Sequence, residues 1–292
     1  MYFSKLYIFL IMIIWLASYP KSGNTWVRSI VSSLLYTDDG IFNFELLKNI
    51  KQFPEKKFMK DFVNNFNDFN EIKKNWILAQ DKINLTGNTN LFKTHQGKYT
   101  VGGDDFTNSE NTSAVIYIVR DPRNLVQSIS NHFTMTTERA YNFLISPEII
   151  GNGKSWDERK DGLYNLLGKW NDHYRSWTRN KENLLLIKYE DLINNTELEL
   201  ERLTKFLKRF LSFKTDKNKN QNIIKSTTFE NLKQLEKKGL FKEDVLKKGT
   251  KTKVNFFHLG PENKWQKSLD DKMALKIEEN FRTEMKELGY IN

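Results

Sequence analysis

SYPKSGNTW, at residues 18–26, is the stretch of sequence that decides the fold. An apolar run, residues 13–17, stands immediately before it and has the length of a buried strand. After it, apolar side chains recur at helical spacing, at Val27, Ile30, Val31 and Leu34. The sequence therefore predicts a strand at residues 13–17, a tight loop, and a helix at residues 24–35.

The loop between this strand and helix carries several groups that bind anions. Gly23 allows the backbone to approach a ligand closely, and Lys21 adds a positive charge. Ser22 and Thr25 add hydroxyl groups, and the N-terminus of a helix attracts phosphate. The loop differs from the nucleotide-triphosphate pattern GxxxxGK[ST], because its lysine precedes the glycine. We expect a phosphate site here; the alternative is a turn that binds nothing.

Length and composition limit the class of protein. The chain has 292 residues, of which 39% are hydrophobic, which suits one large α/β domain. The net charge of +10 fits anionic partners, but it also fits a lysine-rich solvated surface. The absence of cysteine excludes disulfides and thiolate chemistry. The four histidines lack metal-ligand spacing, so we expect no metal site.

Further apolar runs alternate between strand and helix patterns along the chain. We expect strands at residues 90–94, 114–119 and 183–188. We expect helices at residues 163–177, 193–210 and 270–288, and a further helix that begins at Asp121 and Pro122. The segment at residues 43–75 is expected to be mixed and largely helical. Residues 214–222 have the composition of a solvated loop. Alternating strands and helices predict a parallel sheet covered on both faces, with ligands bound beyond the carboxyl ends of the strands.

The N-terminal residues resemble a signal peptide, because Lys5 precedes an apolar run at residues 6–17. Cleavage near Ser18 would remove the strand that carries the loop, so we reject this interpretation. We expect residues 1–11 to be a dispensable extension and residues 12–292 to form a single domain.

YPKSGNTW resembles the 5′-phosphosulfate loop YPKSGTTW of cytosolic-type, bacterial-like sulfotransferases that use 3′-phosphoadenosine 5′-phosphosulfate (PAPS); only Asn24 departs. The resemblance implies a single α/β domain whose central parallel sheet is flanked by helices, similar to P-loop nucleotide hydrolases and kinases. It also implies that PAPS is held by Lys21, Ser22, Gly23, Asn24, Thr25 and, beside the adenine, Trp26.

Two more segments resemble the family in the expected order. VIYIVRDPRNLVQSISNHF, residues 115–133, resembles the 3′-phosphate segment, which implies that Arg120 and Ser128 contact this phosphate. LFKTHQ, residues 91–96, resembles the family segment whose histidine is the general base, which implies that His95 takes the acceptor proton. Lys21 and Lys93 would then stabilise the charge on the transferring group.

Three weaker matches complete the resemblance. LLLIKYEDL, residues 184–192, implies that Tyr189 contacts the nucleotide, and STTFENLK, residues 226–233, implies adenine contacts from Thr227, Thr228 and Phe229. FFHLGPENKW, residues 256–265, resembles a loop that grips the 3′-phosphate. There His258 and Leu259 replace an Arg and a Lys of the family, and Gly260 keeps its place. Replacement contacts are expected from Lys251, Lys253, Lys264 or the Gly260 amide.

The resemblance implies transfer of a sulfuryl group from PAPS to a hydroxyl, with an amine as the second choice. The acceptor is expected to be a small molecule, carbohydrate or lipid, and the compartment the cytoplasm. We expect no nucleic-acid partner and no transmembrane segment. Two alternatives remain open: a P-loop nucleotide kinase and a non-catalytic anion-binding protein.

Overall fold

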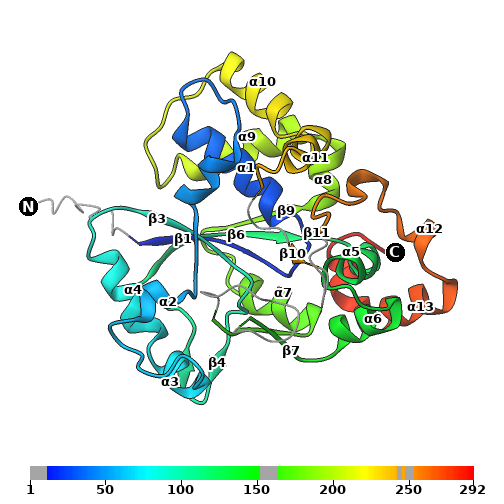
Figure 1. Cartoon of the computed structure of the whole chain (residues 1–292), viewed down its shortest axis with the longest axis horizontal. Coiled ribbons are helices and arrows are strands. Elements are labelled where there is room, and N and C mark those ends of the chain that lie inside the picture. Colours follow the sequence, from blue (N-terminus) through cyan, green and yellow to red (C-terminus); the bar gives the residue numbers. More distant parts are fainter. Residues whose placement is uncertain (1–11, 152–162, 242–244, 247–252) are drawn as a thin grey trace, which may run out of the picture.

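The structure, a computed structural model, describes residues 12–151, 163–241, 245–246 and 253–292. A parallel sheet in the order β2-β3-β1-β6-β9 crosses its centre (Figure 1). Its strands are β1 (Ile13–Ser18), β2 (Lys51–Gln52), β3 (Asn90–Thr94), β6 (Thr112–Val119) and β9 (Leu184–Lys188). Because β2 and β3 lie on one side of β1 and β6 and β9 on the other, the strand order reverses at β1. Ligand sites of open α/β sheets form beyond the strand ends at such a reversal.

Helices cover both faces of the sheet, as the alternating pattern predicts (Figure 1). One face is covered by α1 (Asn24–Tyr36), η1 (Phe44–Asn49), α8 (Tyr189–Asn194), α9 (Thr196–Leu207), α10 (Lys217–Ser226) and α11 (Phe229–Lys237). The other is covered by α2 (Lys56–Met59), α3 (Phe69–Lys74), α4 (Trp76–Asn84), α5 (Pro122–Phe133), α6 (Thr137–Ile145), α7 (Trp170–Thr178), α13 (Asp271–Asn280) and α14 (Arg282–Glu287). The short elements are η2 (Gly260–Glu262), α12 (Trp265–Ser268) and three hairpins: β4 (Thr100–Val101) with β5 (Asp104–Asp105), β7 (Glu148–Ile150) with β8 (Asn165–Gly168), and β10 (Val245–Leu246) with β11 (Lys253–Val254).

The strand β1 is completely buried and divides the core into two hydrophobic clusters. Successive side chains of a strand point to opposite faces. Trp15 therefore packs with the aromatic residues of the α4 and α7 side, including Phe106 and Trp177. Leu16 packs on the opposite face with the residues of α1 and α9. Burial on both faces explains why the sequence of β1 is continuously apolar.

The central strands and the first helix agree with the sequence-based expectations, but five other segments differ. The helix expected at residues 163–177 begins only at Trp170, because residues 165–168 pair with β7 as β8 and Gly168 has a φ of +67°. The helix expected at residues 193–210 is interrupted at Asn195, whose side chain caps α9 by accepting from the amide of Leu198. The helix expected at residues 270–288 is divided at Phe281.

Residues 214–222, expected to be a solvated loop, contain the start of α10, because Asp216 caps this helix by accepting from the amide of Lys219. The segment at residues 43–75 combines η1, β2, α2 and α3 rather than being largely helical. Residues 1–11 and Lys251, on which two expectations fall, lie outside the described residues.

Candidate active site

The loop between β1 and α1 is shaped to receive an anion. Lys21 and Gly23 have φ values of +67° and +103°, so the backbone turns tightly before the helix. No side chain caps α1 at Gly23, and its first turn has no acidic residue, which leaves the positive end of the helix dipole uncompensated at the loop. The Ser22 hydroxyl is buried and has no hydrogen-bond partner among the described residues. A phosphate in this loop fits both features.

Asn24 and the end of β1 fix the loop in place. The Asn24 side-chain amide donates to the Leu16 carbonyl oxygen at 3.0 Å and to the Ser18 hydroxyl at 3.2 Å. Thr25, the next residue, is also buried. Asn24, the one departure from the family pattern in this motif, therefore connects the start of α1 to the last residues of β1. The sequence signalled the position but not this contact.

Three predicted cofactor residues, Arg120, Tyr189 and Trp26, meet beside the loop. Arg120 follows β6 and donates from Nη1 to the Lys21 carbonyl oxygen at 3.2 Å. Its guanidinium carbon lies 4.1 Å from the ring centroid of Tyr189, which follows β9. The Tyr189 ring contacts Trp26 edge to face, with centroids 5.7 Å apart. Ser128 lies in the second turn of α5 and is half-buried.

Arg120, Tyr189 and Trp26 form one wall of the candidate site, and helix α11 with the segment at residues 256–260 forms a second wall. Phe229 packs on Gly260 so closely that a Cβ at this glycine would lie 2.4 Å from the Phe229 ring. Lys233 Nζ donates to the His258 carbonyl oxygen at 2.9 Å, and the Glu236 carboxylate accepts from the amides of Phe256 and Phe257 at 2.6 and 3.1 Å. Phe229, Lys233 and Glu236 thus fix this segment from one side of α11.

The two walls come together at Lys21. Its Nζ lies 3.6 Å from the ring centroid of Phe256, a cation–π contact. Burial lowers the pKa of His258, and the nearby charges of Lys233 and Lys21 lower it further. Lys233 lies in the segment 226–233 that resembles the family, but no sequence pattern marked it as a site residue. Its charge lies beside the position where the family has Arg and Lys.

The hydroxyls of Thr227 and Thr228 are engaged by the protein. Thr227 is fully buried and donates to the Ile223 carbonyl oxygen at 2.7 Å. Thr228 caps α11 by accepting from the amide of Asn231 at 3.2 Å. Both residues therefore shape the turn that presents Phe229.

His95 follows β3 and lies next to the end of β1. Its Nδ1 is 2.8 Å from the Ser18 carbonyl oxygen and 3.3 Å from the Ser18 hydroxyl. A carbonyl oxygen only accepts, so Nδ1 carries the proton and Nε2 of the neutral ring carries the lone pair. Lys93, two residues earlier, is 6% exposed and lies in β3.

A second histidine, His173, forms a hydrogen bond with the backbone of His95. His173 is fully buried in α7, with Nε2 3.1 Å from the His95 carbonyl oxygen and Nδ1 2.8 Å from the Tyr117 hydroxyl. Nε2–H therefore donates to His95, and Nδ1 accepts from Tyr117. Burial lowers the pKa of His173 to about 4, so its ring is neutral near neutral pH. No sequence pattern around His173 indicated this role.

Among the described residues, no three His, Cys, Asp or Glu side chains are grouped so as to hold a metal ion. None of the helices in the described part of the chain combines the length and apolar character that a membrane span requires.

Comparison with known proteins identifies the family. Residues 13–289 match the family model described as the sulfotransferase domain, so the chain belongs to this family. It is 23% identical over 221 residues to the 3-alpha-hydroxysteroid sulfotransferase of Cavia porcellus and 27% identical over 222 residues to cytosolic sulfotransferase 1 of Danio rerio. Each match covers 75% of this chain but only 65% of the relative. The luciferin sulfotransferase of Photinus pyralis is 24% identical over 90% of this chain and 69% of its own length.

Solved structures support the fold. Mouse sulfotransferase SULT7A1 complexed with PAP matches 95% of this chain and 85% of its own, with a TM-score of 0.55 and 17% identity. Retinol dehydratase in a complex with retinol and PAP matches 94% and 81%, with a TM-score of 0.58 and 18% identity. The predicted fold class, a parallel α/β sheet flanked by helices, is confirmed.

Proposed function

We propose that this chain is a PAPS-dependent sulfotransferase that transfers a sulfuryl group to a hydroxyl of a small-molecule acceptor. The observation that carries the proposal is the convergence of the Lys21 loop, Arg120 and His95 at the carboxyl ends of adjacent parallel strands. Membership of the sulfotransferase family supports it, and two solved structures with this fold are complexes with PAP.

The residues of the two walls suit the parts of such a donor. The amides of the loop and the charge of Lys21 suit the 5′ end, and the planar fork of Arg120 suits a phosphate at the 3′ end. Trp26 and Phe229 offer aromatic faces for an adenine. Ser128, Tyr189 and Gly260 are proposed to complete the nucleotide contacts, and Thr227 and Thr228 to hold the turn that presents Phe229 to the adenine. His258 joins them as a weaker substitute for the family arginine, with Lys233 supplying the charge.

PAPS supplies the sulfuryl group, and 3′-phosphoadenosine 5′-phosphate (PAP) remains after the acceptor oxygen has taken that group. His95 provides the base, because its Nδ1–H bond to Ser18 places the basic lone pair of the ring on Nε2. Lys21 and Lys93 stabilise negative charge that develops during transfer, as preorganised cations. A hydroxyl is the preferred acceptor, because it becomes a good nucleophile only when a base removes its proton.

The acceptor class and the compartment rest on the family. Two of the relatives are named 3-alpha-hydroxysteroid sulfotransferase and cytosolic sulfotransferase 1. These names favour a small apolar alcohol as the acceptor and the cytoplasm as the compartment. No nucleic-acid partner is proposed, although the net charge of +10 is basic.

The experiment is a screen for PAPS-dependent sulfate-ester formation on phenols, sterols and sugars, with wild type and His95→Ala. We expect the variant to lose turnover by about 100-fold or more while keeping wild-type affinity for PAP, because general-base catalysis contributes about 10²–10⁴-fold. Loss of turnover and PAP binding together would assign His95 a structural role. PAP binding without turnover by wild type would favour a non-catalytic binding protein.

A further inference from the structure

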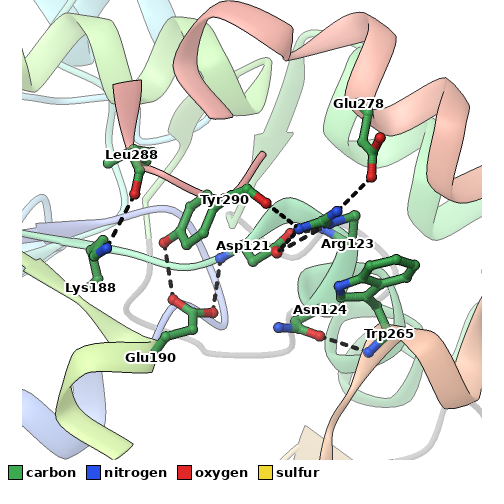
Figure 2. Close-up of polar contacts among 9 residues, drawn as sticks. All are labelled: Asp121, Arg123, Asn124, Lys188, Glu190, Trp265, Glu278, Leu288 and Tyr290. Carbon is green, nitrogen blue, oxygen red and sulfur yellow. Dashed lines mark hydrogen bonds and ion pairs between the residues drawn. The ribbon is translucent and has the colours of Figure 1, made fainter. Parts of the chain in front are cut away.

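Beyond the proposed catalytic residues, the facing ends of β6 and β9 are joined by a side chain. Val119 and Lys188 are the last backbone partners of this parallel pair. Beyond them, the Asp121 amide donates to Oε1 of Glu190 at 3.1 Å (Figure 2). The Glu190 carboxylate therefore acts where the next backbone carbonyl of a longer strand would have acted. This contact comes immediately after Arg120 and Tyr189, the stacked pair of the candidate nucleotide site.

The same carboxylate is bound from its other side by Tyr290, whose hydroxyl donates to Oε2 at 3.0 Å (Figure 2). A carboxylate that accepts from an amide and a hydroxyl is satisfied as an ion. Burial raises the pKa of Glu190 above its ordinary value, and the charge of Arg120 and the bond from the Asp121 amide oppose this rise. The electrostatic contact with Arg120 therefore favours the ionised form of Glu190.

The position of Tyr290 is itself fixed by backbone contacts. The Tyr290 amide donates to the Met285 carbonyl oxygen at 2.8 Å, which ends α14 in a tight turn. Lys188 donates to the Leu288 carbonyl oxygen at 3.2 Å, and Arg123 donates to the Tyr290 carbonyl oxygen at 2.9 Å (Figure 2). These bonds aim the ring of Tyr290 at Glu190.

The two arginines around Asp121 have different environments. Arg123 donates to both oxygens of Asp121, reaches Glu278 at 2.5 Å and lies 4.3 Å from the Trp265 ring centroid. Its hydrogen-bonding capacity is therefore used within the protein. Arg120, by contrast, has a buried Nε without a hydrogen-bond partner in the part of the chain that the structure describes. The arrangement reserves Arg120 for a ligand and commits Arg123 to the framework.

We infer that Glu190 and Tyr290 are positioning residues for recognition of the 3′-phosphate. Tyr290 holds the Glu190 carboxylate on the Asp121 amide, and this bond fixes the turn that presents Arg120 and Tyr189 to the nucleotide. The inference rests on the proposed function, because it assigns Arg120 to the 3′-phosphate. It extends the site to a residue that lies 100 positions from Glu190 in the sequence.

The test compares the affinities for PAP and for adenosine 5′-monophosphate, which lacks the 3′-phosphate, by calorimetry on the full chain. The variants are Tyr290→Phe, Glu190→Ala and Glu190→Gln. The matched control is Tyr174→Phe, because the Tyr174 hydroxyl also donates to a carboxylate, that of Glu287, at 3.0 Å. This control removes an equivalent bond outside the candidate site.

We expect Tyr290→Phe to lower the preference for PAP over the monophosphate by about threefold to tenfold, the equivalent of one hydrogen bond. Glu190→Ala should lower it at least as much, and Glu190→Gln should restore part of it, because the amide oxygen still accepts from Asp121. Tyr174→Phe should keep the wild-type preference.

Each other outcome overturns the inference. An unchanged preference in Tyr290→Phe shows that the contact does not reach the 3′-phosphate site. An equal loss of both affinities shows a purely structural role. If wild type itself shows no preference for PAP, the assignment of Arg120 fails, and the proposed function fails with it; that result is visible before any variant is measured.

Discussion

Replacing Gly23 by Ala tests the geometry of the anion loop, and the structure supplies its own control. Gly23 has a φ of +103°, and a Cβ there would lie 2.6 Å from Cδ2 of Tyr189. Gly103 has a φ of +90°, and a Cβ there would meet nothing within 4 Å. Both variants place a side chain in the left-handed region, which costs about 1–2 kcal/mol, and both reduce the entropy of the unfolded chain similarly. The difference between them therefore measures the contact with Tyr189.

The Tyr189 ring has little room to move away. It is 6% exposed and lies between Trp26, at 5.7 Å, and the guanidinium of Arg120, at 4.1 Å. Overpacking of this kind costs about 1–3 kcal/mol. We therefore expect Gly23→Ala to lower the free energy of unfolding by about 1–3 kcal/mol more than Gly103→Ala.

Urea unfolding measures the stability difference, and calorimetry with PAP measures its effect on the site. Gly23→Ala should weaken PAP binding, because Tyr189 and Arg120 must shift, and Gly103→Ala should bind PAP as wild type does. Equal stabilities of the two variants, with wild-type PAP affinity in Gly23→Ala, would refute the geometry described for the loop.

Two further predictions concern stability. Because the pKa of His173 is about 4 in the folded protein against 6.5 when unperturbed, the unfolded chain binds more protons between these values, so stability falls as pH falls through this range. The loss in the free energy of unfolding approaches about 1.4 kcal/mol per pH unit, and His173→Phe should abolish it. Urea unfolding in which wild type and His173→Phe have parallel pH profiles would disprove this. Thr228→Ala should lower the free energy of unfolding by about 1 kcal/mol through loss of the α11 cap, and Thr228→Ser should not; thermal unfolding that ranks the two variants equally would reject the cap.

The sequence predicted the parts of the fold that depend on local pattern. The strands β1 and β6 contain the continuous apolar runs at residues 13–17 and 114–119, and β3 contains a shorter one at residues 91–92. The loop before α1 has its glycine and lysine in a recognisable order. The failures occur where one residue overrides a helical pattern. Asn195 caps a new helix inside an apparently continuous one, and Gly168 ends β8 within a stretch whose periodicity favours a helix. Periodicity averages over a window and does not detect such single positions.

The candidate site was predictable in its motif residues but not in their supports. Lys21, Arg120 and His95 follow strands, so a parallel sheet brings them to one edge. The contacts of Glu190 with Tyr290 and of His95 with His173 join residues 100 and 78 positions apart. Such pairs depend on how α7 and α14 pack on the sheet, which no local pattern encodes.

The central claim is that the Lys21 loop binds a nucleotide with a 3′-phosphate. Calorimetric titration of wild type with PAP and with ATP and magnesium tests it most directly, alongside Lys21→Ala and the surface control Lys82→Ala. Lys82 pairs only with Asp61 among the acidic residues of the described ranges, at 2.6 Å. We predict that wild type prefers PAP, that Lys21→Ala weakens PAP binding by about tenfold or more, and that Lys82→Ala does not. Absence of PAP binding, or a preference for ATP with magnesium, would contradict the account and favour a kinase or a different anion-binding role.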